Sequence, residues 1–185
     1  MTTVLIPLAQ GCEELEAVTI IDLMRRAGIK VTTASLDDNP VIASRGTVLV
    51  ADTILDNALQ NSYDMIVLPG GLPGADHLRD DPRIITLLKN MADKGKYLSA
   101  ICAAPKVLAH AGLLKNKRAT AYPGTLEKLG LPDTIIESTP VVIDGNIVTS
   151  QGPGTAMDFT LTLIELLLSQ EKRDEVENAL QRDNK

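Results

Sequence analysis

The most constraining feature of this sequence is the segment from Tyr97 to Pro105, which reads Tyr-Leu-Ser-Ala-Ile-Cys-Ala-Ala-Pro. Its first five residues are mostly apolar and predict a buried strand, and Pro105 then opens a helical pattern that runs to Ala111. Cys102 therefore stands at the turn between a strand and a helix. Such an elbow lifts one side chain above the carboxyl edge of a sheet, and it directs the free N–H groups of the next helix toward the same place.

Two interpretations of Cys102 follow from this position. Free cysteine is among the most buried residue types, so the thiol can be a small core residue that happens to end a strand. Alternatively, Cys102 is a nucleophile, and the N–H groups at the elbow lower the pKa of its thiol. The residues that the fold brings near the elbow decide between these interpretations.

The rest of the chain alternates apolar strand-like runs with helical patterns. Strands are expected at 3–8, 29–35, 63–68, 97–101 and 118–121, hairpins at 41–52 and 141–150, and helices at 13–27, 82–94, 105–111, 155–168 and 171–181. The continuous apolar runs are typical of central parallel strands. The sequence therefore predicts an α/β fold, a single doubly wound and mostly parallel sheet with helices on both faces.

Length and composition limit the remaining choices. A chain of 185 residues is long enough for one domain with a sizeable core, so we expect a single domain over 1–185. Apolar residues make up 44% of the chain but aromatics only 2%, which requires a core of aliphatic side chains. The net charge of −6 argues against nucleic acid, because phosphate binding needs a basic surface.

The termini and the cysteines indicate a cytoplasmic protein. The first residues lack the basic start of a signal peptide, and the most apolar late run, Leu161 to Leu168, contains Glu165 and is far too short to span a membrane. Cys12 and Cys102 have no metal-binding or disulfide-framework spacing. We expect no metal and no structural disulfide, although a reversible Cys12–Cys102 bond under oxidation stays open, since both residues follow strands at the same edge.

One carboxylate is out of place on the helical pattern at 13–27. Projected at 100° per residue, Glu16 falls on the apolar arc between Leu23 and Ala27. A buried carboxylate has to find a partner or keep its proton. A proton shared with Cys102 meets both needs and assists the thiol. The alternative is a half-exposed acid at the edge of the helix interface.

The segment Pro69-Gly70-Gly71 directly follows a predicted strand at the same sheet edge. Two glycines let backbone N–H groups approach a reacting carbonyl closely, as an oxyanion hole requires, although a plain turn explains the pair equally well. A histidine base is harder to place. His110 lies about 12 Å along the helix from the thiol, and His77 stands at a helix start where surface histidines are common. We therefore expect a site that works without a histidine base.

Five motifs resemble one protein family. They are Gly-Cys-Glu-Glu-Leu-Glu-Ala-Val at 11–18, Leu-Met-Arg-Arg-Ala-Gly-Ile-Lys-Val at 23–31, Val-Leu-Pro-Gly-Gly at 67–71, Ala-Ile-Cys-Ala-Ala-Pro at 100–105 and Ser-Gln-Gly-Pro-Gly-Thr at 150–155. In this order they resemble the ThiJ/PfpI superfamily, and within it the parkinsonism-associated protein deglycase branch with its bacterial YajL-like members. The resemblance implies a flavodoxin-like fold, a homodimer and a site without a cofactor.

The resemblance also implies roles for individual residues. The nucleophile matches Cys102, the acid that contacts it matches Glu16, and the backbone donors match Gly71 and Ala103, with Gly70 beside them. Members of the family often have a histidine after the elbow helix, where this chain has Tyr122, a phenol that can donate a hydrogen bond but is a poor base. Arg26 and Arg45 match positions that lie near the partner subunit's pocket in the family.

These roles lead to two main hypotheses of function. In the first, Cys102 adds to the carbonyl carbon of methylglyoxal, glyoxal or their protein and nucleotide adducts, which makes the chain a glyoxalase or deglycase, a hydrolase or lyase that protects against carbonyl and oxidative stress. In the second, oxidation of Cys102 to sulfinic acid makes it a redox sensor or chaperone. A protease is a weaker third choice, because no histidine is placed for acyl transfer.

Overall fold

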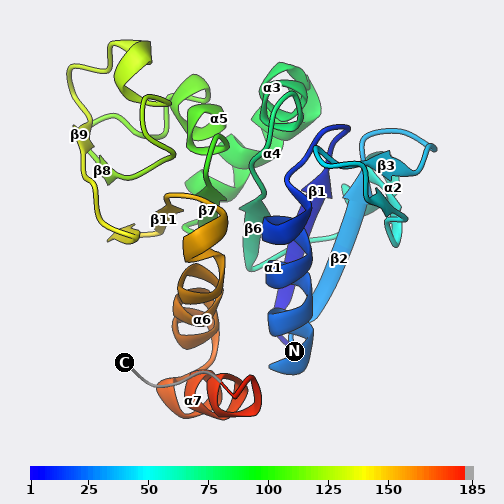
Figure 1. Cartoon of the computed structure of the whole chain (residues 1–185). Coiled ribbons are helices and arrows are strands. Elements are labelled where there is room, and N and C mark those ends of the chain that lie inside the picture. The colour runs from blue at the N-terminus through cyan, green and yellow to red at the C-terminus, as the bar shows by residue number, and fades with distance from the viewer. Residues whose placement is uncertain (182–185) are drawn as a thin grey trace.

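The computed structural model describes residues 1–181 and contains a seven-stranded sheet flanked by helices (Figure 1). Its strands lie in the order β10, β11, β7, β6, β1, β2, β5. Each neighbouring pair is parallel except β10 with β11, which form an antiparallel hairpin. The mostly parallel sheet that the sequence predicts is therefore confirmed. Residues 182–185 of the expected domain lie outside the described part of the chain.

The strands are short and mostly buried. Those of the main sheet are β1 Thr3–Leu8, β2 Lys30–Ser35, β5 Thr53–Ile54, β6 Met65–Leu68, β7 Tyr97–Ile101, β10 Val141–Asp144 and β11 Ile147–Ser150. Two smaller sheets pair β3 Val41–Ile42 with β4 Val48–Leu49, and β8 Arg118–Ala119 with β9 Ile135–Ile136. Both predicted hairpins are confirmed. The strand expected at 118–121 forms, but outside the main sheet.

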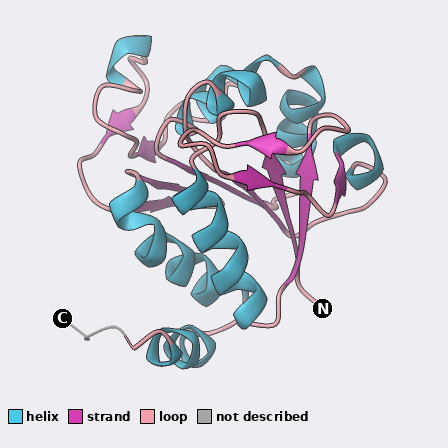
Figure 2. Cartoon of the chain, turned by 45° about the vertical axis from the view of Figure 1, so that its right-hand side comes forward, coloured by secondary structure: helices cyan, strands magenta, loops and turns pink. Residues whose placement is uncertain are grey.

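Helices cover both faces of the sheet, as predicted (Figure 2). They are α1 Glu14–Arg26, α2 Leu55–Ala58, α3 Gly74–Asp80, α4 Pro82–Asp93, α5 Pro105–His110, α6 Ala156–Leu167 and α7 Gln170–Ala179, with short 3₁₀ turns at Glu127–Leu129 and Pro153–Thr155. One apolar core joins the sheet to α1 and α6, which lie side by side. A second core joins the other face to α2, α3, α4 and α5.

Helix α3 is the main element that the sequence pattern misses. It follows a run of glycines and prolines that reads as a loop, and seven residues are too few to show a helical period. Long-range contacts stabilise it instead. The N–H of Gly74 donates to the carbonyl of Gly11 at 3.3 Å, and Leu78 is fully buried in the second core. Tertiary contacts therefore convert an apparent loop into a helix that begins beside the candidate site.

We predict that Asp81→Ala lowers the free energy of unfolding by about 1 to 2 kcal/mol, because Asp81 caps α4. Its carboxylate accepts a hydrogen bond from the N–H of Arg83 at 2.9 Å and forms an ion pair with the Arg83 guanidinium. Urea denaturation of both variants measures the effect. The control is Asp93→Ala, which removes an exposed acid from the last turn of the same helix and should change stability by less than about 0.5 kcal/mol. Equal losses in the two variants would contradict the capping role.

Candidate active site

Cys102 occupies a strained backbone position at the end of β7. Its φ of +63° lies in the left-handed region, which costs a non-glycine residue about 1 to 3 kcal/mol. Two hydrogen bonds hold it there. The N–H of Cys102 donates to the carbonyl of Ser150 at 3.0 Å, and the carbonyl of Cys102 accepts the N–H of Tyr122 at 2.9 Å. The expected elbow is present, and it is fixed by segments 20 and 48 residues downstream.

Glu16 lies beside the thiol and is fully buried, on the inner face of α1. Its Oε2 accepts the N–H of Gly70 at 2.8 Å, and its carboxyl group is hydrogen-bonded to Cys102. The second oxygen, Oε1, has no nitrogen or oxygen partner among the described residues. The half-exposed alternative for Glu16 is therefore wrong, because the side chain is enclosed and directed at the sulfur.

Two backbone N–H groups, from Gly71 and Ala103, donate to the sulfur of Cys102. Each donor belongs to a peptide whose carbonyl is also fixed. The carbonyl of Gly70 accepts the N–H of Glu13 at 2.9 Å, and this sets the Gly71 N–H on the other side of the same peptide plane. The bond from Tyr122 to the Cys102 carbonyl orients the Ala103 N–H in the same way. Both donors are thus aimed before any ligand arrives.

Neither of the two glycines beside Cys102 has room for a side chain. A β-carbon at Gly70 would lie 2.6 Å from Cβ of Cys102 and 2.8 Å from Oε2 of Glu16. A β-carbon at Gly71, whose φ is +90°, would lie 2.4 Å from the backbone nitrogen of Glu13. All three distances are too short for a side chain at these positions. The glycine pair therefore does more than turn the chain, since it lets the donor loop touch the thiol and the carboxyl group.

Burial controls the charges of the pair. Desolvation raises the pKa of Glu16 to about 7, although the hydrogen bonds from Cys102 and Gly70 act against it. Desolvation, followed by the charge of an ionised Glu16, raises the pKa of Cys102 to about 12. The lowered pKa that the sequence predicts therefore does not hold for a thiol beside an ionised Glu16. The pocket tolerates one negative charge on the pair but strongly disfavours two.

The placement of the single charge follows from the donors around each group. A thiolate at Cys102 accepts the N–H groups of Gly71 and Ala103, and it gains a third donor if Glu16 holds the proton. A carboxylate at Glu16 accepts the N–H of Gly70 and the S–H of Cys102. Because three donors stabilise a charge better than two, we infer that the proton of the singly charged pair resides on Glu16 and the charge on sulfur.

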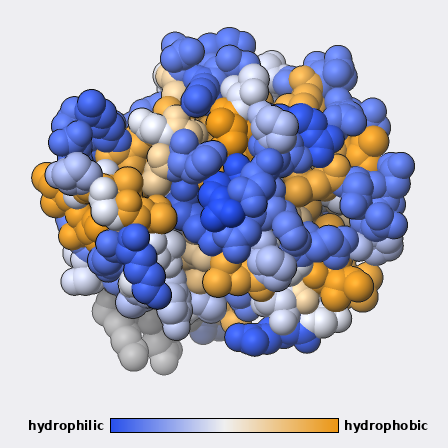
Figure 3. Space-filling view, turned by 90° about the horizontal axis from the view of Figure 1, so that it is seen from above, coloured by the Kyte–Doolittle hydropathy of each residue, from blue (hydrophilic) through white to orange (hydrophobic). Residues whose placement is uncertain are grey.

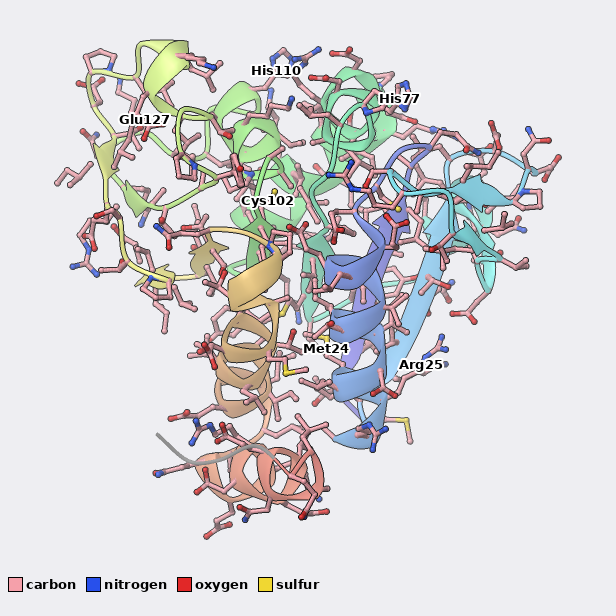
Figure 4. All side chains as sticks on the ribbon, viewed as in Figure 1. Met24, Arg25, His77, Cys102, His110 and Glu127 are labelled. Carbon is pink, nitrogen blue, oxygen red and sulfur yellow. The ribbon has the colours of Figure 1, made fainter. Side chains whose placement is uncertain are left out.

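Neither histidine serves the thiol. His77 lies on α3, is exposed, and shares a hydrogen bond with the carbonyl of Gln10 at 3.0 Å (Figure 4). His110 is the last residue of α5, at the end opposite the elbow. Neither residue contributes to the shift in the pKa of Cys102. Glu16 is the acid–base group that the fold provides there.

The two predicted arginines lie in different places. Arg45 is exposed at the tip of the β3–β4 hairpin, and its N–H donates to both carboxylate oxygens of Glu14, at 3.0 and 3.1 Å, which ties the hairpin to the start of α1. Arg26 is at the opposite end of α1, about 15 Å along the helix from Glu16, and pairs with Asp22 at 2.7 Å. Within one subunit, Arg26 therefore does not line the site.

Cys12 and Tyr122 flank the site on two sides. Cys12 is a free, fully buried cysteine, and desolvation together with Glu14 and Glu13 raises the pKa of its thiol to about 12. Tyr122 is 54% exposed, and a β-carbon at Gly152 would lie 3.4 Å from its Cδ2. The Tyr122 ring therefore packs over Gly152 at the rim of the elbow.

Sequence reasoning missed two supporting residues, Ser150 and Glu14, and the backbone role of Tyr122. Ser150 and Tyr122 fix the elbow through backbone atoms, and Glu14 binds the β3–β4 hairpin. Backbone acceptors carry no residue signature, so only the motif at 150–155 pointed to this region. Viewed from above, the carboxyl edge of the sheet is largely hydrophilic at its centre, with hydrophobic patches toward the sides (Figure 3).

Comparison with known proteins identifies the family. The model of the DJ-1/PfpI family matches residues 2–166. The chain belongs to the DJ-1/PfpI family. The resemblance seen in the motifs is thereby confirmed, while the closer likeness to bacterial YajL-like members stays a prediction.

Individual members of the DJ-1/PfpI family match over most of the chain. Protein DJ-1 homolog A of Arabidopsis thaliana is 46% identical over 180 residues, 96% of this chain and 46% of the relative. The glutathione-independent glyoxalase DJR-1.2 of Caenorhabditis elegans is 34% identical over 163 residues, 88% of this chain and 87% of the relative. The crystal structure of Drosophila melanogaster DJ-1beta has a TM-score of 0.94 and 38% identity, with 98% of each chain covered. The chain spans less than half the length of the plant relatives that it matches.

Two further properties concern residues 1–181. In this range no group of three or more His, Cys, Asp and Glu side chains is arranged to hold a metal ion. None of the helices in the same range is long and apolar enough to cross a membrane. The chemistry described above rests on Cys102, Glu16 and the backbone donors.

We predict that Glu16→Leu raises the pH at which Cys102 becomes a thiolate by about one to two pH units, because it removes a hydrogen-bond donor from the thiolate. Thiolate absorbance against pH, measured in a Cys12→Ala background, gives the midpoint. Glu165→Leu, which replaces an exposed acid on α6, is the control and should leave the midpoint unchanged. A lower midpoint in Glu16→Leu would show that Glu16 is ionised beside a protonated thiol.

Proposed function

We propose that this DJ-1/PfpI protein is a cofactor-independent glyoxalase or deglycase that uses Cys102 to act on methylglyoxal, glyoxal and their adducts. The observation that carries the proposal is the convergence of Glu16 and the N–H groups of Gly71 and Ala103 on one sulfur atom. A thiolate with an adjacent proton donor is suited to addition to an aldehyde. The relative from Caenorhabditis elegans, named a glutathione-independent glyoxalase, supports the same chemistry.

The reaction of methylglyoxal begins with attack of the Cys102 thiolate on the aldehyde carbon. The carbonyl oxygen takes the proton of Glu16, and the product is a hemithioacetal. The Glu16 carboxylate then removes the hydrogen of that carbon as a proton and returns it to the neighbouring ketone carbon, while the proton of the new hydroxyl group passes to the ketone oxygen. The aldehyde carbon becomes a thioester while the ketone becomes an alcohol, so no external oxidant is needed. Water hydrolyses the thioester to lactate and restores the thiol.

The backbone donors and Tyr122 assist these steps. The N–H groups of Gly71 and Ala103 hold the thiolate before attack and stabilise the oxyanion that develops next to it. The phenol of Tyr122, at the rim, donates a hydrogen bond to the second carbonyl of the substrate, a role that needs no change in its protonation. With Glu16 as the acid–base group beside the thiol among residues 1–181, the site performs proton transfers within a small substrate rather than peptide hydrolysis.

A redox-sensing role is the second candidate function. The three donors around the sulfur also suit the oxygen atoms of an oxidised Cys102, which peroxide converts first to sulfenic and then to sulfinic acid. The unpartnered Oε1 of Glu16 favours this candidate, since a protonated carboxyl group there donates to a sulfinate oxygen. A chaperone-like response in the cytoplasm would follow from the effect of this oxidation on stability or partner binding.

The decisive test compares methylglyoxal turnover by purified wild type, Cys102→Ser and Cys12→Ala. We predict lactate formation by wild type and by Cys12→Ala, and a loss of at least about a hundredfold in Cys102→Ser, because the hydroxyl is a far weaker nucleophile. Mass spectrometry after peroxide treatment is run in parallel. Absence of turnover in wild type, with stoichiometric oxidation of Cys102, would contradict the enzyme and favour the redox sensor.

We also propose that the protein is a homodimer that uses the outer face of α1 and the β3–β4 hairpin. Leu15 and Val18 lie one turn apart on α1 and are about half exposed, and Val48 and Val50 of the hairpin are more exposed still. Arg26, which the family resemblance places near a partner subunit, forms an ion pair with Asp22 in the same chain, and its neighbour Arg25 forms one with Asp52. The apolar side chains therefore carry this proposal.

For the homodimer we predict twice the chain mass by light scattering at micromolar concentration. Val18→Glu should give the mass of one chain, because a charge on the apolar face opposes burial. The control Ile135→Glu, at an exposed apolar position on β9, should remain dimeric. A single-chain mass for the wild type would exclude the dimer.

A further inference from the structure

The donor loop and the elbow are each followed by a short helix, and an ion pair joins these two helices. Asp76 stands in the first turn of α3, and Lys106 in the first turn of α5. Nζ of Lys106 lies 2.6 Å from Oδ1 of Asp76, and only 13% of the Lys106 side chain is exposed. The two helices are in contact with each other. The ion pair is thus a direct link between the segments that carry Gly71 and Ala103.

The position of Lys106 is unusual for a helix. Negative side chains are favoured in the first turn of a helix, where the N–H groups are unpaired, and positive ones are disfavoured there. Lys106 has no acidic neighbour in that turn of α5. Its partner comes from α3 instead, and Asp76 also accepts a hydrogen bond from Arg79 at 2.9 Å. The bond to Asp76 explains a largely enclosed lysine in this unfavourable place.

Few residues separate the ion pair from either of the two backbone donors. Ala103 is three residues before Lys106, and Gly71 is five residues before Asp76, with the N–H of Ala75 donating to the Gly71 carbonyl at 2.9 Å. A shift of α3 relative to α5 therefore changes the separation of the two N–H groups at the sulfur. The charge of Lys106 is not among the causes that shift the pKa of Cys102, so an effect of the pair on the thiol has to act through geometry.

We propose that Asp76 and Lys106 are positioning residues that hold the Gly71 and Ala103 donors together on Cys102. The proposal rests on the proposed function for its effect on turnover, whereas its effect on the thiolate does not depend on any substrate. Donor placement at a reacting atom is sensitive, since an error of about 1 Å can cost a hundredfold in rate. Loss of the ion pair should make the thiolate less stable relative to the thiol and slow every reaction of the sulfur.

The test measures the midpoint of thiolate formation and the rate of Cys102 oxidation by peroxide in four variants with Cys12→Ala as background. Lys106→Met and Asp76→Asn should each raise the pH midpoint of thiolate formation and slow the oxidation of Cys102 about tenfold. The effects of the two variants should be similar, because each breaks the ion pair. Lys106→Arg should have a midpoint of thiolate formation and an oxidation rate close to those of the Cys12→Ala background, since it keeps the ion pair. The variant that combines Lys106→Met with Asp76→Asn should change the midpoint and the oxidation rate no more than either substitution alone, as expected for one shared interaction.

Lys96→Met is the matched control. It breaks the ion pair of Lys96 with Asp64, at 2.9 Å, which joins the amino ends of the same strands, β6 and β7. Lys96→Met should lower the midpoint of thermal unfolding. It should leave the midpoint of thiolate formation and the oxidation rate of Cys102 unchanged. The proposal is overturned if Lys106→Met and Asp76→Asn reduce stability as Lys96→Met does and leave the thiol unchanged. It is also overturned if Asp76→Asn favours the thiolate while Lys106→Met disfavours it, which would mean that the lysine charge acts directly.

Failure of the proposed function is distinguishable from failure of this inference. If wild type does not turn over methylglyoxal, the thiolate midpoint and the peroxide rate still report on the ion pair. If wild type turns it over, kcat/KM for methylglyoxal should fall about tenfold in Lys106→Met and recover in Lys106→Arg.

Discussion

The structure depends on a geometric constraint, namely that two peptide planes from different parts of the chain aim their N–H groups at one sulfur atom. One plane follows β6 and the other follows β7, and these strands are adjacent and parallel. Parallel pairing places both carboxyl ends at the same edge of the sheet. Each plane is then locked through its own carbonyl, by Glu13 in one case and by Tyr122 in the other. The left-handed backbone of Cys102 is the strained conformation that brings the sulfur between them.

A second constraint is electrostatic. Cys102 and Glu16 are buried together in a pocket where one negative charge is tolerated and two are not. The thiol is therefore not activated by burial, which acts against ionisation, but by the balance of donors around the pair. In the proposed reaction, Glu16 supplies a proton to the thiolate and to the products that it forms. This explains how a site without a nearby histidine can combine a nucleophile with an acid.

Part of this arrangement could be predicted from the sequence. The strand-to-helix elbow, the inward-facing Glu16 and the glycine pair each leave a local pattern, because strand and helix periods are set by neighbouring residues. The backbone bonds from Ser150 and Tyr122 leave none, since any residue can supply a carbonyl or an N–H. Helix α3 was hidden by the Gly- and Pro-rich run before it. The raised pKa of Cys102 beside an ionised Glu16 was missed because desolvation depends on how completely distant segments enclose the thiol.

The central claim is that the pair carries one negative charge with its proton on Glu16. Infrared difference spectra between wild type and Glu16→Gln, recorded over a pH series with thiolate absorbance on the same samples, test it directly. The account predicts that the carboxylic acid band of Glu16 persists at pH values where the Cys102 thiolate has already formed. Loss of that band before any thiolate appears would contradict the account, because it would place the charge on Glu16 and leave the sulfur protonated.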